Sequence, residues 1–224
     1  MIRTVLLCAA LAMPWVQAAA PVVSAVLNNS SLIPAGFPNS GVAPSSLFVI
    51  QGTGMAAPGS NPVLQDSAQG LPTTLNGTSI SVTVGGTTVA PAIYYTSPTQ
   101  VAAVLPAATP VGNGTITVSY NATPSASAPI QVVPNAYGFD IYNGLAVATD
   151  ATSGGLITYT NSAKPGQVLV FWGTGLGADP ADSDTTYTAS SQRFRRRSRC
   201  TSAACRFRRR PSLMWAHPFI PASG

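Results

Sequence analysis

The segment Ser79–Val84 alternates polar and apolar residues without exception, and Gly85 and Gly86 follow it directly. Such alternation is typical of a β-strand with one buried face and one exposed face. A Gly-Gly pair tolerates the positive φ angles of a two-residue hairpin turn. We therefore expect the chain to return as a partner strand over residues 89–95, with Pro91 marking an edge or a bulge.

Strand signals of this kind recur along the chain, with turn residues between them. The chain contains 20 Gly and 20 Pro, and only 8% of its residues are charged. No segment shows a convincing helical period, which excludes coiled coils and helix bundles. Short strands separated by turns describe an all-β, antiparallel β-sandwich. The other candidate strands are residues 47–50, 100–105, 115–120, 129–133 and 169–172.

An apolar strand that runs into Gly-Thr-Gly occurs twice, once ending at Gly54 and once at Gly175. We interpret the two copies as one structural device, a bulge or turn at the end of a strand. A nucleotide-binding glycine loop would need a helix after it to present backbone N–H groups to phosphate. Residues rich in Pro and Asp follow instead, so the structural interpretation is favoured.

The first 18 residues have the pattern of a secretory signal peptide. Arg3 precedes a short apolar run over residues 5–13, and Val16-Gln17-Ala18 suits a signal peptidase. The apolar run is too short to span a bilayer, so we expect no transmembrane segment after cleavage. The predicted location is therefore secreted or at the cell surface.

Charge is distributed very unevenly. Residues 19–192 contain no Arg, Glu, His or Cys, and their one Lys and six Asp give a formal charge of −5, whereas the whole chain carries +5. Without His, Glu or Cys, neither a Ser–His pair nor a zinc site can form in this body. We predict a protein that is not an enzyme, with no catalytic residue, no cofactor and no firm metal site.

One acidic cluster is a weak candidate for Ca²⁺ binding. Asp179, Asp182 and Asp184 are close in sequence, and Ca²⁺ prefers oxygen ligands. The glycine and the terminal Glu of a Ca²⁺-binding loop are missing. A solvated acidic turn is therefore the favoured interpretation.

Aromatic residues of the body offer a second candidate site. They could form an exposed platform for sugars, although core packing is the expected fate of most of them. The set consists of Tyr94, Tyr95, Tyr137, Tyr142 and Trp172.

The composition changes abruptly at Arg193. Nine Arg and two Cys lie between Arg193 and Arg210, where the preceding body has neither residue type. One interpretation is a basic arm for polyanions or anionic surfaces. We favour a second interpretation, a tail translated out of frame. Codons that can encode the tail from Arg193 onward can also be read in a shifted frame. In that frame they can encode a strand of alternating residues, then Gly-Gly, then a return strand interrupted by Pro.

Several motifs together resemble immunoglobulin-like domains of the IPT/TIG type. The resemblance is closer still to an uncharacterised C-terminal domain family of exported bacterial proteins, abundant in acidobacteria. It extends over about residues 32–179, and it implies an immunoglobulin-like fold in a secreted or cell-surface protein, without catalytic residues. The motifs are residues 42–47, 52–54, 71–75, 82–86, 90–101 and 105–106, then Asn161–Gly166 before Gly173–Gly177.

These observations divide the chain into five parts. We expect a signal peptide (1–18), a leader strand or linker (19–41), an immunoglobulin-like β-sandwich (42–134), an incomplete second β unit (135–192) and a disordered, Arg-rich tail (193–224). The expected function is that of an exported structural or adhesion module whose unknown partner is a cell-surface protein or glycan. The alternative is a secreted protein that binds polyanions or anionic surfaces through Arg193–Arg210. Nucleic acid is an expected partner only if that tail is genuine.

Overall fold

A computed structural model describes residues 19–64 and 72–179. Over these ranges the chain is all-β, its strands pair in antiparallel fashion, and no helix occurs. The strands are β1 (Val22–Asn28), β2 (Leu47–Thr53), β3 (Val63–Leu64), β4 (Thr74–Leu75), β5 (Thr78–Val84), β6 (Thr87–Val89), β7 (Ala92–Thr96), β8 (Gln100–Val104), β9 (Gly112–Tyr120), β10 (Thr123–Pro124), β11 (Ala128–Val132), β12 (Gly138–Phe139), β13 (Ile141–Tyr142), β14 (Leu145–Ala146), β15 (Ala148–Asp150), β16 (Leu169–Phe171) and β17 (Gly173–Thr174).

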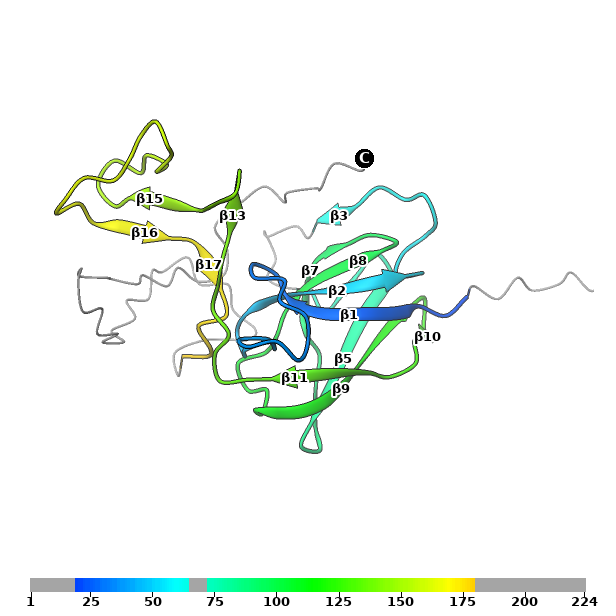
Figure 1. The fold of residues 1–224 in the computed structure, drawn as a ribbon. Helices are drawn as coiled ribbons and strands as arrows, with labels where there is room; N and C mark the ends of the chain where they lie inside the picture. The colour runs from blue at the N-terminus through cyan, green and yellow to red at the C-terminus, as the bar shows by residue number, and fades with distance from the viewer. Residues whose placement is uncertain (1–18, 65–71, 180–224) are drawn as a thin grey trace, which may run out of the picture.

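The strands between Val22 and Val132 form two large sheets (Figure 1). One has five strands in the order β1-β2-β8-β7-β3. The other has six strands, with the path β10-β9-β5-β4, while β11 pairs with β9 and β6 pairs with β5. The leader strand β1 pairs with β2 along its length, so it is part of the five-stranded sheet.

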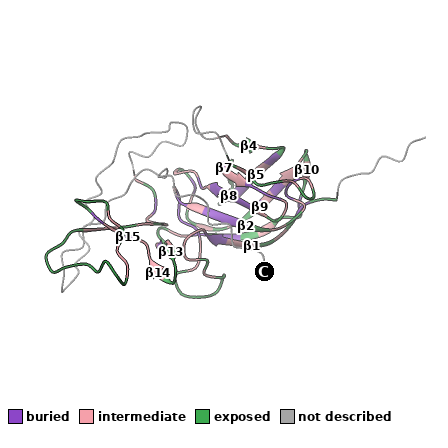
Figure 2. Ribbon diagram, turned by 90° about the horizontal axis from the view of Figure 1, so that it is seen from above, coloured by how far each residue is buried: buried purple, intermediate pink, exposed green. Residues whose placement is uncertain are grey.

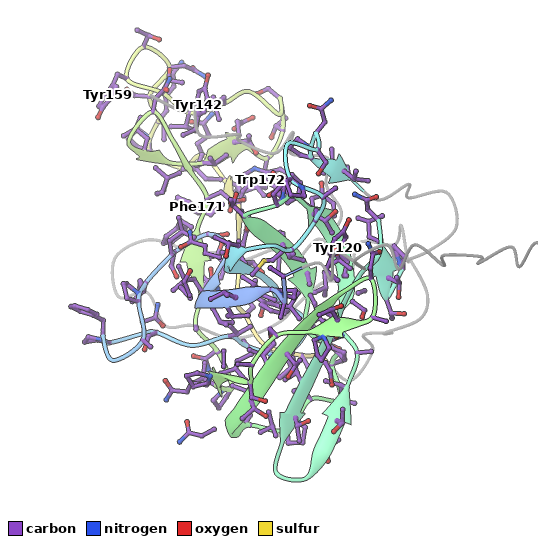
Figure 3. All side chains as sticks on the ribbon, turned by 90° about the vertical axis from the view of Figure 1, so that its right-hand side faces the viewer. Tyr120, Tyr142, Tyr159, Phe171 and Trp172 are labelled. Carbon is purple, nitrogen blue, oxygen red and sulfur yellow. The ribbon has the colours of Figure 1, made fainter. Side chains whose placement is uncertain are left out.

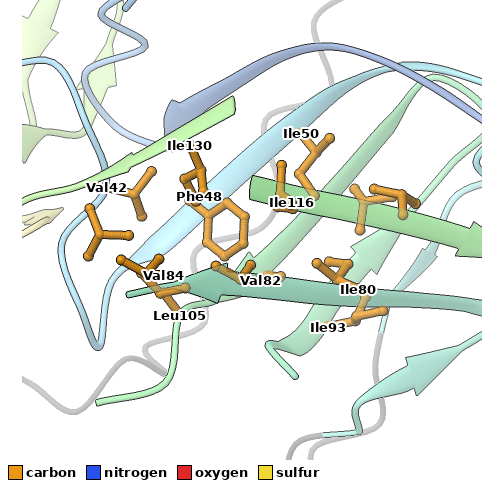
Figure 4. Close-up of a cluster of buried hydrophobic side chains, with 14 of the residues drawn as sticks. Val42, Phe48, Ile50, Ile80, Val82, Val84, Ile93, Leu105, Ile116 and Ile130 are labelled. Carbon is orange, nitrogen blue, oxygen red and sulfur yellow. The ribbon is translucent and has the colours of Figure 1, made fainter. Parts of the chain in front are cut away.

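One hydrophobic core lies between these two sheets (Figure 4). In β5 the alternation seen in the sequence places Ile80, Val82 and Val84 on the buried face. Phe48 and Ile50 of β2 belong to the same buried cluster, although they come from the other sheet. Two antiparallel sheets that share a core are consistent with a β-sandwich. Figure 2 shows the buried residues concentrated in these strands.

The predicted hairpin turn after Val84 is confirmed, whereas the predicted return strand is not a single strand. Gly85 and Gly86 have φ angles of 56° and 81°, and β6 pairs with β5 only as far as Val89. The chain then passes the buried Pro91, and β7 joins the five-stranded sheet. Pro91 therefore lies at a crossover between the sheets, and the register shift in β7 falls between Ile93 and Tyr95 instead.

The two Gly-Thr-Gly copies have the same local structure. A Cβ added to Gly52 would lie 1.9 Å from the carbonyl oxygen of Val22, and one added to Gly173 would lie 2.0 Å from that of Gly138. The last glycine of each copy has a positive φ, 71° at Gly54 and 104° at Gly175. The first glycine thus allows a neighbouring strand to approach closely, and the last allows the turn. No helix follows either copy within the described ranges.

Residues 135–179 form three small two-stranded sheets beside the large ones (Figure 1). The pairs are β12 with β17, β13 with β14, and β15 with β16. In the hairpin of β13 and β14, Asn143 and Gly144 both have positive φ angles, as a tight type I′ turn requires. The strand predicted over residues 169–172 is β16, followed directly by β17.

The predicted signal peptide and the Arg-rich tail lie outside the described residues. Within the described ranges, the chain has no helix with the length and apolarity needed to cross a membrane.

Candidate functional site

Asn28, the last residue of β1, links the large sheets to the segment 135–179. Its side chain is buried, and its Nδ2 donates hydrogen bonds to the carbonyl oxygens of Ala136 (2.9 Å) and Thr174 (3.3 Å). Its Oδ1 accepts hydrogen bonds from the backbone N–H groups of Ser30 (2.9 Å) and Ser31 (3.0 Å). Both ends of this amide are therefore satisfied, and it joins parts of the chain that are distant in sequence.

Two further contacts strengthen the same junction. The backbone N–H of Leu47 in β2 donates a hydrogen bond to Oγ1 of Thr174, at 2.9 Å. Gly138 lies so close to Ser31 that an added Cβ would be 2.6 Å from the Cβ of that serine. The segment 135–179 is thus held against β1 and β2 by polar contacts and by close backbone packing.

Asp150, at the end of β15, organises the loop that leads to β16. Its Oδ1 accepts hydrogen bonds from the backbone N–H of Ser153 (2.6 Å), the hydroxyl of Ser153 (2.8 Å) and the backbone N–H of Thr152 (3.0 Å). Its Oδ2 accepts one from Nε2 of Gln167, at 2.7 Å. The backbone hydrogen bond from Ser153, followed by these others, lowers the pKa of the Asp150 carboxyl against the opposing effect of burial.

The Pro-Gly motif of the second half forms a β-turn beside this carboxylate. Gln167 N–H donates a hydrogen bond to the carbonyl oxygen of Lys164 at 3.1 Å, across Pro165 and Gly166. Gly166 has a φ of 80°, so the turn has the Pro-Gly pattern and the positive third-position φ of type II. Because Gln167 also bonds to Asp150, the turn fixes the start of β16.

Three aromatic rings from β16 and the chain around β12 form a contiguous row. The rings of Tyr137 and Phe139 meet edge-to-face with centroids 5.1 Å apart, and those of Phe139 and Phe171 meet similarly at 5.5 Å. Burial, and then the charge of Asp140, raises the pKa of Tyr137 to about 12. Trp172 donates its indole N–H to Oγ1 of Thr149, at 3.2 Å. The row is fixed by packing, and its two Phe rings remain partly exposed.

The same segment displays much of the exposed apolar surface of the described chain. Among the described residues twelve large hydrophobic side chains are exposed, and seven of them fall between residues 139 and 171. Tyr159 is 81% exposed, and Figure 3 shows Tyr142 and Tyr159 in the outer part of the segment. We name these seven residues the apolar face: Phe139, Ile141, Tyr142, Leu156, Tyr159, Val168 and Phe171.

The aromatic residues predicted as a platform do not form one group. Tyr94 and Tyr95 lie half-buried in β7, within the five-stranded sheet. Tyr137, Tyr142 and Trp172 all lie in the segment 135–179, where Tyr137 belongs to the aromatic row and Tyr142 to the apolar face.

The sequence prediction did not include Phe139, Phe171 or Tyr159. The sequence does contain a signal for Phe139. Tyr137, Phe139 and Ile141 occupy every second position, and such residues lie on one face of an extended chain.

The weak Ca²⁺ candidate is only partly covered by the structure. Asp179 lies within the described residues, while Asp182 and Asp184 lie outside them. In the described ranges, no group of three His, Cys, Asp or Glu side chains is placed to hold a metal ion.

Comparison with models of known protein families found no match for this chain, and comparison with curated protein sequences found no significant match.

Proposed function

We propose that this chain is a non-enzymatic, exported module that binds a cell-surface protein or glycan through the apolar face. The observation that carries this proposal is the concentration of exposed large hydrophobic side chains between residues 139 and 171. Exposed apolar patches on soluble proteins mark interaction sites, and aromatic residues are enriched where partners bind. The absence of His, Glu and Cys from residues 19–192 supports a binding role over catalysis.

The proposal includes the finer identity of the fold. Two antiparallel sheets around one core, together with the motif order given above, support an immunoglobulin-like sandwich of the IPT/TIG type. The small sheets of residues 135–179 support a second, incomplete unit that repeats the Gly-Thr-Gly device. The signal-peptide pattern supports export to the surface or the medium.

Binding of the mature chain to intact bacterial cells and to a glycan array tests the function. We expect binding that survives deletion of residues 193–224, because the apolar face lies in the retained part. Absence of binding to both probes would contradict the proposal.

A second candidate function rests on the nine Arg between Arg193 and Arg210. A genuine basic arm would bind heparin or DNA, and its affinity would fall steeply with salt concentration. Binding of this kind that disappears on deletion of residues 193–224 would favour the polyanion function over the apolar face.

A further inference from the structure

Strand β16 is paired along one edge only among the described residues. Its partner is β15, with Thr149 opposite Val170. The flanking hydrogen bonds run from Ala151 N–H to the oxygen of Val168 (2.9 Å) and from Trp172 N–H to the oxygen of Val147 (3.0 Å). In an antiparallel ladder, alternate residues direct both backbone groups to the same side. Residues 168, 170 and 172 therefore face β15, while Leu169 and Phe171 direct their N–H and C=O groups to the opposite edge.

This edge lacks the charged residues and prolines by which many natural sheets prevent pairing with other chains. Proteins usually protect an open edge with charged residues, proline or a covering segment. No charged residue occurs between Pro165 and Ala178, and no proline follows Pro165 in that stretch. Val168 is 50% exposed and Phe171 is 36% exposed, so apolar side chains flank backbone groups that have no partner among residues 19–64 and 72–179.

We propose that this edge pairs with the β16 strand of a second copy of the chain. Two β16 strands related by a two-fold axis at Val170 would place Leu169 opposite Phe171 of the other copy. The outward N–H and C=O groups of both residues would then find partners, as the self-complementary interface of a symmetric dimer requires. The uncharged stretch extends to both sides of Val170, so no like charges meet. Val168 and Phe171 also belong to the apolar face, so this interface borders the proposed ligand-binding surface. Its test by cross-linking needs no ligand.

The two-fold register makes a specific geometric prediction. Val170 falls opposite its own counterpart at a non-hydrogen-bonded position, where Cα atoms lie about 4.5 Å apart. That separation is within the range that a disulfide spans, about 4.4–6.8 Å. Val168 falls opposite Trp172 of the other copy, so two cysteines at position 168 would be too far apart to join.

Cysteine cross-linking of the full mature chain tests this interface. In a C200S/C205S background, we expect Val170→Cys to form a covalent dimer on mild oxidation, and Val168→Cys to remain monomeric. Without the new cysteines, light scattering should detect a dimer. We expect Val170→Lys to raise the dissociation constant of this dimer by about tenfold or more, because it places two positive charges opposite each other. Thermal unfolding of each variant verifies that the fold is retained.

Three results would overturn the proposal. They are a monomer at all concentrations up to about 100 μM, equal cross-linking at positions 168 and 170, and a dimer that retains its affinity after Val170→Lys. If Val170→Lys does not fold, the comparison of the two cysteine variants decides alone.

Discussion

Thr96 places a hydroxyl group in the core without a hydrogen-bond partner among the described residues. Thr78, equally buried, donates its hydroxyl to the carbonyl oxygen of Met55 at 2.6 Å. An unsatisfied buried polar group destabilises a protein by about 1–3 kcal/mol, whereas removal of a satisfied one leaves its partner unpaired. We expect Thr96→Val to raise the free energy of unfolding by about 1 kcal/mol and Thr78→Val to lower it by about 1–3 kcal/mol. Urea denaturation measures both, and equal losses in the two variants would contradict this prediction.

The Asp150 carboxyl predicts a local dependence on pH. Its pKa in the folded chain lies below the ordinary value of 3.8, because the Ser153 backbone N–H, the Ser153 hydroxyl and Gln167 donate hydrogen bonds to the charged form. This carboxylate therefore stabilises the folded loop fully above the ordinary pKa, and the contribution is lost as the pH falls through the lowered value.

Carbon NMR of the Asp150 carboxyl during an acid titration measures this pKa. We expect a midpoint below 3.8 and a simultaneous loss of hydrogen-exchange protection at Thr152 and Ser153. Asp150→Asn is the control, since it removes the charge and should abolish the pH dependence. A midpoint at or above the ordinary value would show that these hydrogen bonds do not form.

The Gly-Thr-Gly elements make a paired prediction, because each brings two strands too close for a side chain. Gly52→Ala and Gly173→Ala would push a Cβ against the carbonyl oxygens of Val22 and Gly138. Crowding of this kind lowers the free energy of unfolding by about 1–3 kcal/mol. In the Gly173 variant we expect hydrogen-exchange protection to fall within residues 135–179 and to persist in the two large sheets.

Gly155→Ala is the matched control for both variants. A Cβ at Gly155 would meet two side-chain atoms and no backbone atom, the Ser153 hydroxyl oxygen at 3.3 Å and Asn161 Nδ2 at 3.8 Å. The φ of Gly155 lies outside the left-handed region. We expect Gly155→Ala to lower the free energy of unfolding less than the substitutions at Gly52 and Gly173 do. Chemical denaturation of all three variants measures this. If Gly155→Ala is as destabilising as the others, close strand approach is not the reason for the glycines.

The local sequence pattern predicted an element well where the residues that pair with each other are close in sequence. The alternation before Gly85 corresponds to β5, and the Gly-Gly turn has the expected positive φ angles. The pattern did not reveal that the chain changes sheets near Pro91, because that choice depends on β8, which pairs with β7. The role of Asn28 was equally hidden, since its partners lie 108 and 146 residues away. The aromatic row depends on a contact between Phe139 and Phe171, which lie on strands that do not follow one another in the chain.

For the whole molecule, the attachment of residues 135–179 depends strongly on Asn28. Asn28→Ala would leave the carbonyl groups of Ala136 and Thr174 without this donor, and the expected loss is about 1–3 kcal/mol. Asn39→Gly is the control, because Asn39 also donates to this segment, to the Tyr137 carbonyl at 3.1 Å, but from an exposed position. Glycine adopts the φ of 63° at this position without strain. The expected effect of this control is below about 0.5 kcal/mol.

Limited proteolysis and hydrogen exchange report the attachment directly. In Asn28→Ala we expect faster cleavage and faster exchange within residues 135–179, with the large sheets unchanged. Equal behaviour of the Asn28 and Asn39 variants would mean that the buried amide does not hold the two parts together.

The uneven distribution of charge also indicates a change of reading frame in the gene. The body of −5 and the abrupt appearance of nine Arg after residue 192 support our proposal that residues 193–224 are translated out of frame. Sequencing of the gene past codon 192 measures this. We expect a frame change there, and an uninterrupted frame confirmed by independent reads would contradict it.

Paired variants of the mature chain test whether the apolar face binds the partner. Ile141→Ser with Tyr159→Ser alters two highly exposed positions of that face, at 57% and 81% exposure. Phe37→Ser with Val111→Ser alters comparably exposed positions elsewhere, at 63% and 55%. For binding to bacterial cells or to a captured glycan, we predict a loss of about tenfold or more in affinity for the first pair and no change for the second. Equal affinities for the two pairs would mean that the apolar face does not bind the partner.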